Sequence, residues 1–165
     1  AVDVHESTIH VKGPKGELSW TYPDKMNVSI NGGIVSVERA GDTKIERALH
    51  GLTRSIITNM VIGVSQGYQK VLDIVGIGYK AQVSGDKIML TLGYSHPIEF
   101  QLPPGIKAST DQKQVQITLT GVDTQQVGQV AASLKALRRP DAYKGKGIRY
   151  SGQRIKLKVG KAGKK

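Results

Sequence analysis

The segment VSVERAG at residues 35–41 recurs as VQITLTG at residues 115–121, and this repeat decides the fold that we expect. In both copies apolar side chains alternate with polar ones before a glycine, which is typical of a strand with one buried face that ends in a turn. Pro23 and Pro103 precede the two copies at the same offset of 80 residues. The repeat indicates that the chain contains one structural module twice.

A helical pattern follows each copy of the segment. Thr43 and Glu46 have the spacing of a capping box, and Asp123 and Gln126 form a similar pair after the second copy. Apolar residues then recur every three or four positions, so we expect amphipathic helices, the first from about residue 44 to 62. The two apolar stripes are Ile45, Leu49, Leu52, Ile56 and Met60, and Val127, Val130, Ala131, Leu134 and Leu137.

The remaining alternating stretches are separated by turns rich in glycine and proline. They predict paired strands on both sides of the first helix, including a hairpin at Asn31–Gly33, where Asn-Gly is a strong turn signal. We therefore predict an α+β fold of two tandem duplicated domains, each an antiparallel β-sheet with one amphipathic helix packed on it. The expected domains are residues 1–75 and residues 76–165.

The positive charge of the chain is concentrated at its C-terminal end. The chain has 24 Lys and Arg against 13 Asp and Glu, a net charge of +11. Residues 135–165 contain twelve of these cations and one acid, Asp141, whereas the rest of the chain has twelve of each sign. Such segregation is typical of a protein that places one end on a polyanion.

The sequence RRPDAYKGKGIRY at residues 138–150 is the centre of this basic region. Pro140 and the Gly-Lys-Gly run exclude a helix interior, and unpaired cations exclude a core strand. We expect an exposed loop in which cations meet phosphates, tyrosines stack or hydrogen-bond, and glycines allow close approach to RNA. A solvated basic tail is the alternative interpretation, above all for residues 161–165.

Two neighbouring segments extend the predicted site. Cations at i, i+3 and i+4 share one face of the last helical turn, where they also suit the helix C-terminus. Residues 154–159 alternate and predict a strand with its cations outward and its apolar residues in the core, although an edge strand protected by lysine has the same pattern. The expected RNA-binding residues are Lys135, Arg138, Arg139, Tyr143, Lys144, Gly145, Lys146, Gly147, Arg149, Tyr150, Arg154, Lys156 and Lys158.

No pattern for catalysis, cofactor binding or metal binding stands out. Residues 76–81 fit the dinucleotide pattern G-x-G-x-x-A, but an alternating stretch follows where that motif needs a helix, so we interpret the glycines as a bend. The four histidines are scattered without metal or triad spacing, and there is no cysteine. We expect no enzymatic activity, no cofactor, no small-molecule substrate and no membrane-spanning segment, because no apolar run approaches 18 residues.

Several segments resemble one family, in that family's order. They are VKGPKGEL (11–18), NMVIGVSQGY (59–68), VGIGYKA (75–81), LGYSHP (92–97) and the basic stretch at 138–150. These segments are similar to those of the bacterial large-subunit ribosomal protein L6 family. Family members open with a short basic lead that this chain does not show, so we expect a few residues to be missing before Ala1.

The resemblance implies a structural constituent of the large subunit, built from two tandem domains of one fold. It also implies a cytoplasmic ribosomal location and binding to the last domain of 23S rRNA near the translation-factor region, with neighbouring ribosomal proteins as partners. From the residues themselves, the nearly uncharged segment 61–67 makes the first copy a buttress or a protein-facing surface. The alternatives are a protein that binds an anionic membrane surface, which would favour a basic amphipathic helix, and an enzyme that uses the Gly-x-Gly turn.

Overall fold

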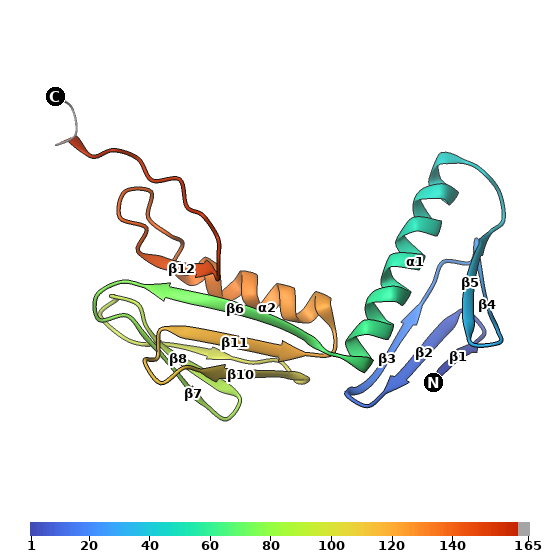
Figure 1. The fold of residues 1–165 in the computed structure, drawn as a ribbon, viewed down its shortest axis with the longest axis horizontal. Coiled ribbons are helices and arrows are strands. Elements are labelled where there is room, and N and C mark those ends of the chain that lie inside the picture. Colours follow the sequence, from blue (N-terminus) through green and yellow to red (C-terminus); the bar gives the residue numbers. More distant parts are fainter. Residues whose placement is uncertain (162–165) are drawn as a thin grey trace. The chain divides into compact units, whose positions relative to one another are not determined.

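The computed structural model describes residues 1–161, which form two compact units (Figure 1). The first unit contains Ala1–Tyr68 and Val122–Thr124, and the second contains Gln69–Gly121 and the chain from Gln125 onward. Each unit combines antiparallel strand pairs with one long helix, α1 (Lys44–Ser65) or α2 (Thr124–Leu137). The predicted α+β class and the duplication are confirmed.

The first unit has a three-stranded antiparallel sheet of order β1-β2-β3 and a hairpin of β4 and β5. Gly32 and Gly33 have φ angles of 58° and 84°, so the predicted Asn-Gly hairpin turn is present. The sheet and α1 enclose a small core that includes Ile9, Val11 and Met60. The strands are β1 (Val2–His5), β2 (Thr8–Gly13), β3 (Gly16–Thr21), β4 (Met26–Asn31) and β5 (Ile34–Arg39).

Helix α1 begins at the predicted capping box but presents a different face to the core. Ile45 and Leu52 of the expected stripe are 67% and 50% exposed, whereas Glu46, Thr53 and Ile57 are buried. The Glu46 carboxylate accepts hydrogen bonds from the Thr43 N–H (3.0 Å) and hydroxyl (2.6 Å). Met60 of the expected stripe is buried, but nearer the start of α1 the buried residues each lie one position beyond the predicted ones.

The predicted end of α1 near Gly63 lies two residues before the observed end, and that glycine instead serves close packing. A Cβ at Gly63 would lie 2.1 Å from the Val122 carbonyl oxygen, a distance that no side chain tolerates. The helix continues through it to Ser65, and Gly67 with φ 76° follows the C-cap at Gln66.

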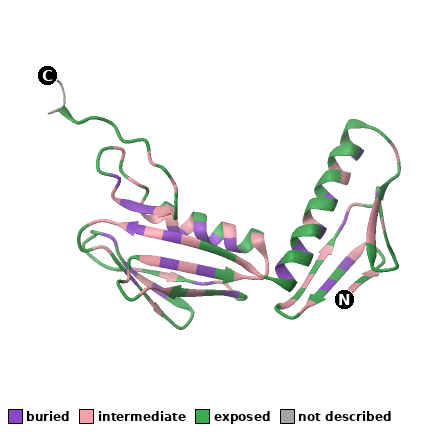
Figure 2. Ribbon diagram, in the orientation of Figure 1, coloured by how far each residue is buried: buried purple, intermediate pink, exposed green. Residues whose placement is uncertain are grey.

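The second unit contains two sheets. One is three-stranded with the order β7-β8-β9, and the other is four-stranded with the order β10-β11-β6-β12. Buried positions alternate along β6 and β11 (Figure 2), where Leu72, Ile74, Ile117 and Leu119 belong to the core. The strands are β6 (Tyr68–Val75), β7 (Lys80–Ser84), β8 (Lys87–Thr91), β9 (Ile98–Gln101), β10 (Ile106–Thr110), β11 (Gln116–Gly121) and β12 (Gly147–Tyr150).

The boundary between the units lies at residues 68–69 and not near residue 75. Strand β6 lies between β11 and β12, and its Ile74 N–H donates to the Val115 carbonyl at 2.7 Å. The apolar run 71–75 showed that a buried strand was present but not which sheet it joins, so the predicted domain boundary placed it in the wrong unit.

Two predictions for the C-terminal region are also corrected. Residues 147–150, expected in a loop, form edge strand β12, in which Ile148 pairs with Ile74 and is fully buried. Residues 154–159, expected as a strand, lie outside any strand, and Val159 is 80% exposed (Figure 2). β12 is the last strand of its sheet, but residues 154–159 do not pair with its outer edge, and the Lys158 N–H donates instead to the Ala142 carbonyl of the loop.

Candidate nucleic-acid interface

Only two of the three cations at the end of α2, Lys135 and Arg139, line the same part of the surface, whereas Arg138 contacts another part. Lys135 lies over the Tyr150 ring, with Nζ 4.5 Å from its centroid, and donates to Gln153 Oε1 at 3.1 Å. Arg138 lies over the Tyr94 ring, with Cζ 4.8 Å from its centroid. Helix α2 ends at Leu137, so helical spacing no longer places Arg138 and Arg139. The predicted cluster is therefore two cation–tyrosine pairs and an exposed Arg139.

The surroundings of Arg138 involve two tyrosines that the sequence analysis did not select. The Tyr94 hydroxyl donates to the Leu137 carbonyl at 3.0 Å, which ties the β8–β9 turn to the end of α2. The pKa of Arg138 is raised, first by a hydrogen bond with the Tyr94 side chain and then by its electrostatic interaction with Tyr79. Arg138 therefore stays a cation with its guanidinium held in place.

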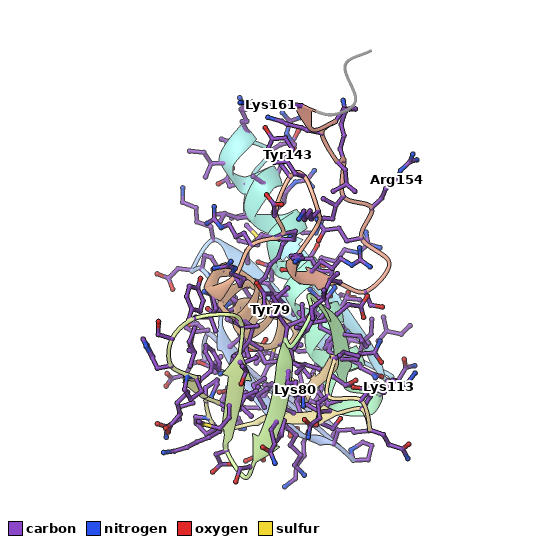
Figure 3. The ribbon with its side chains drawn as sticks, turned by 90° about the vertical axis from the view of Figure 1, so that its left-hand side faces the viewer. Tyr79, Lys80, Lys113, Tyr143, Arg154 and Lys161 are labelled. Atoms are coloured by element: carbon purple, nitrogen blue, oxygen red, sulfur yellow. The ribbon has the colours of Figure 1, made fainter. Side chains whose placement is uncertain are left out.

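The Tyr79 ring is fixed between two glycines. An added Cβ would approach the ring to 2.6 Å at Gly76 and to 2.9 Å at Gly93. Figure 3 shows the ring among the side chains of the second unit. These glycines therefore make room for an aromatic ring, a function that the spacing Gly76-x-Gly78 could not reveal.

The basic loop is closed on itself by its single acid. The Asp141 N–H donates to the Lys146 carbonyl and the Gly145 N–H donates to the Asp141 carbonyl, both at 2.9 Å. The Asp141 carboxylate also accepts from the Lys144 N–H at 3.0 Å. Asp141 thus shapes the loop through backbone groups, and the Tyr143 side chain remains 57% exposed at its tip (Figure 3).

The two glycines of the loop face the protein. Gly147 has φ 145°, and an added Cβ would lie 2.6 Å from the Arg139 carbonyl oxygen. The next N–H, of Ile148, donates to the Arg138 carbonyl at 2.8 Å. Gly145 is buried as well, and a Cβ added there would lie 3.5 Å from the Leu157 side chain. At Gly147, glycine is required so that the loop can pack on the residues that follow α2.

The two predicted site residues in strand β12, Arg149 and Tyr150, are less exposed than Tyr143 and Lys144 of the loop. Arg149 lies across from Asp73 of β6 and is half-buried, and its Nε is buried without a hydrogen-bond partner within residues 1–161. Tyr150 is half-buried beneath Lys135. Lys144 is exposed on the loop, so it is better placed than Arg149 to reach a ligand.

The segment after β12 carries its cations outward. Arg154, Lys156 and Lys158 are exposed, and Arg154 projects away from the ribbon in Figure 3. The Lys158 N–H donates to the Ala142 carbonyl at 2.7 Å, which holds the segment against the basic loop. The last expected tail residues, 162–165, lie outside the described part of the chain. Loop and segment together form one basic surface on the second unit.

The described residues show no geometry for dinucleotide binding, metal binding or membrane spanning. Residues 76–79 connect β6 to β7, so the glycine pattern does not begin a helix as a dinucleotide site requires. His50 Nε2 lies 2.9 Å from the Val37 carbonyl oxygen, as a structural histidine does. Within residues 1–161 no three His, Asp or Glu side chains are grouped to hold a metal, and no helix is long and apolar enough to cross a membrane.

Comparison with known proteins decides the family. Residues 1–67 and 75–151 match the family model of Ribosomal protein L6. The chain belongs to the ribosomal protein L6 family. A protein of Thermodesulfovibrio yellowstonii named Large ribosomal subunit protein uL6 is 58% identical over 164 residues, which cover 99% of this chain and 91% of that protein. Proteins of the same name from Listeria welshimeri and Picosynechococcus sp. are 47% and 46% identical with the same coverage.

Membership of the L6 family confirms several expectations. The chain is a structural protein of the large ribosomal subunit and not an enzyme, and it is located in the cytoplasmic ribosome. The two stretches that match the family model leave out residues 68–74, the first seven residues of β6. The match thus covers both structural units, in agreement with the predicted duplication.

Proposed function

We propose that the second unit anchors this L6 protein on 23S rRNA, in the last domain of that RNA and near the region where translation factors bind. The first unit serves as a buttress or as a surface for neighbouring ribosomal proteins. The observation that carries the proposal is the basic surface formed by the loop 141–146 and the segment 154–158. Its exposed cations gather on one unit, and the carboxylate of its single acid accepts a hydrogen bond from the Lys144 N–H.

The electrostatic environment of these cations supports RNA as the partner. The ion pairs seen in the described chain include those of Lys12 with Glu17, Arg39 with Asp42 and Lys87 with Glu99, and these three lie outside the basic surface. The cations near the end of α2 instead contact tyrosine rings and Gln153. Such positive charge is available to neutralise phosphates, and the release of counterions from the RNA then drives binding.

A salt series on single variants tests this proposal. Lys144→Ala and Lys146→Ala should each weaken binding to large-subunit rRNA and lower the slope of log affinity against log salt by roughly 0.7–0.9. Lys15→Ala, which removes an exposed lysine of the first unit, should leave the slope unchanged. Arg149→Ala is measured separately, because its buried Nε couples the result to folding. Parental slopes in both lysine variants would refute the proposal.

The tyrosines should act without altering the salt slope. If the exposed ring of Tyr143 stacks on a base, Tyr143→Ala should cost on the order of 1–3 kcal/mol of binding free energy and Tyr143→Phe much less. If its hydroxyl holds a sugar or phosphate, Tyr143→Phe should cost most of that amount. Tyr150 already carries Lys135 on its ring, so Tyr150→Ala should also displace that cation. Equal binding to anionic lipid vesicles would favour a membrane surface instead.

A further inference from the structure

An open groove of about 530 Å³ lies between α2 and the segment that follows β12. Its floor is formed by Ala132 and Ala136, which are four residues apart on the exposed face of α2. Lys135 and Arg139 line the groove as well, and Tyr150, Gln153 and Ile155 line it from the segment that begins in β12. The two alanines carry only a methyl group and so leave space above the helix.

The side of the groove is preformed by hydrogen bonds. Gln153 Oε1 accepts from Lys135 Nζ at 3.1 Å and from the Tyr150 N–H at 3.4 Å. The Gln153 N–H donates to the Tyr150 carbonyl at 3.0 Å, which closes the turn after β12. The amide of Gln153 thus holds Lys135 over the Tyr150 ring, so the cation is oriented before any ligand arrives.

The chemistry of the groove fits one kind of ligand. Its lining includes two cations and no carboxylate, which favours an anionic group at the edge. Its floor and side offer methyl groups and Ile155, which suit the flat face of a nucleobase. Its volume is within the range of about 300–1,000 Å³ that is usual for small-ligand sites. A phosphate next to a base combines these requirements.

We propose that this groove binds one unpaired nucleotide of the RNA, with the base on Ala132 and Ala136 and its phosphate at Lys135 and Arg139. The inference rests on the proposed function but adds to it. The basic surface binds the RNA backbone by charge, whereas the groove distinguishes RNA that offers a splayed nucleotide from RNA that is fully paired. Protein recognition of RNA sequence is directed mostly at such unpaired positions.

Filling the floor of the groove tests the inference without any change of charge. Ala136→Leu keeps a good helix former at an exposed position, so we expect the thermal midpoint of the full chain to be unchanged. Affinity for large-subunit rRNA should fall about tenfold, which corresponds to about 1.4 kcal/mol, at an unchanged salt slope, because the leucine side chain would occupy the space of the base. Ala132→Leu should act in the same way. Ala48→Leu, at an exposed position of α1, is the matched control and should bind normally.

A fully paired RNA duplex is the second probe and separates the possible outcomes. Ala136→Leu should bind the duplex as the parent does, because a duplex offers no unpaired nucleotide. Equal loss on both RNAs would overturn the inference and indicate a general disturbance of the basic surface. Parental affinity of both groove variants for rRNA would overturn it too, and a lowered slope in Lys144→Ala would then show that the proposed function still stands.

Discussion

Gly147 is the residue at which the basic loop is joined to the end of α2. An alanine there combines an unfavourable φ of 145° with a Cβ 2.6 Å from a backbone carbonyl. Backbone strain of this kind costs about 1–3 kcal/mol. Because the clash adds to the strain, we expect Gly147→Ala to lower the free energy of unfolding by more than that. Urea denaturation of the full chain measures the loss.

Gly152 supplies the matched control. It has φ 76°, but an added Cβ would meet nothing within 4 Å. Gly152→Ala should therefore show backbone strain without a clash, and its unfolding free energy should decrease less than that of Gly147→Ala. Equal losses would mean that the close approach to the Arg139 carbonyl does not restrict this site.

Glu46 should make stability depend on pH. The pKa of Glu46 is lowered from its ordinary 4.5, first by the hydrogen bond from the Thr43 hydroxyl and then by the Thr43 N–H. Because the folded pKa lies below the unfolded one, the ionised carboxylate stabilises the fold above the unfolded pKa. This stabilisation is lost as the pH falls through the folded pKa.

The variant Glu46→Gln isolates this effect, since glutamine still fits a capping box but carries no charge. We expect it to be less stable than the parent near neutral pH and to approach the parent below the folded pKa of Glu46. Urea midpoints measured over a pH series test this. A gap that stays constant with pH would show that ionisation of Glu46 adds nothing to the cap.

At the scale of elements, the loop 141–146 allows the effect of net charge on RNA affinity to be separated from the effect of loop geometry. Asp141→Ala removes an acid, which by itself should tighten binding to RNA, but it also removes the acceptor of the Lys144 N–H. We expect the loss of loop geometry to dominate, so that rRNA affinity falls. Asp86→Ala removes an exposed acid of the β7–β8 turn and should leave binding equal or slightly tighter. Filter binding at fixed salt compares the two variants.

Periodicity predicted most elements because each buries one face. It gave both helices and the alternation of Ile117 and Leu119 in β11. It missed β12 because Arg149 and Tyr150 are only half-buried and a cationic stretch has no signature of a strand. It wrongly predicted a strand at 154–159, because alternation shows which residues could pair with a sheet edge, not whether they do pair.

The candidate site could be predicted in composition but not in geometry. Charge located the basic surface, and the location of Lys144 and Arg154 on it agrees with that expectation. The contact of Arg138 with Tyr94 joins residues 44 positions apart, which no local pattern encodes. The groove beside α2 is lined by Ala132, Ala136 and Tyr150. The sequence alone does not show that the two small residues lie in the same groove as Tyr150.

At the scale of the whole molecule, charge follows the structural units. Residues 1–68 contain seven cations and seven acids, so the net charge of +11 resides in residues 69–165. We expect the fragment 69–165 to retain most of the rRNA affinity and the fragment 1–68 to have little. Filter binding of each fragment at one salt concentration tests this, and equal binding would contradict it.

A shorter fragment provides a control for the boundary. Residues 76–165 keep every predicted RNA-binding residue but lack β6, which lies between β11 and β12. We expect this fragment to be unfolded by circular dichroism and to bind rRNA less tightly than 69–165. A folded fragment 76–165 would show that β12 can find another partner.

The position of β6 also affects the chain while it is being synthesised. One edge of β6 pairs with β12, which ends at Tyr150, close to the end of the chain. That edge stays open while about 75 further residues are made, roughly 4–15 s at typical rates of translation. An open strand edge is a template for pairing with another chain. Nascent chains should be most prone to aggregation in this interval, which is when a chaperone that covers β6 would protect them most.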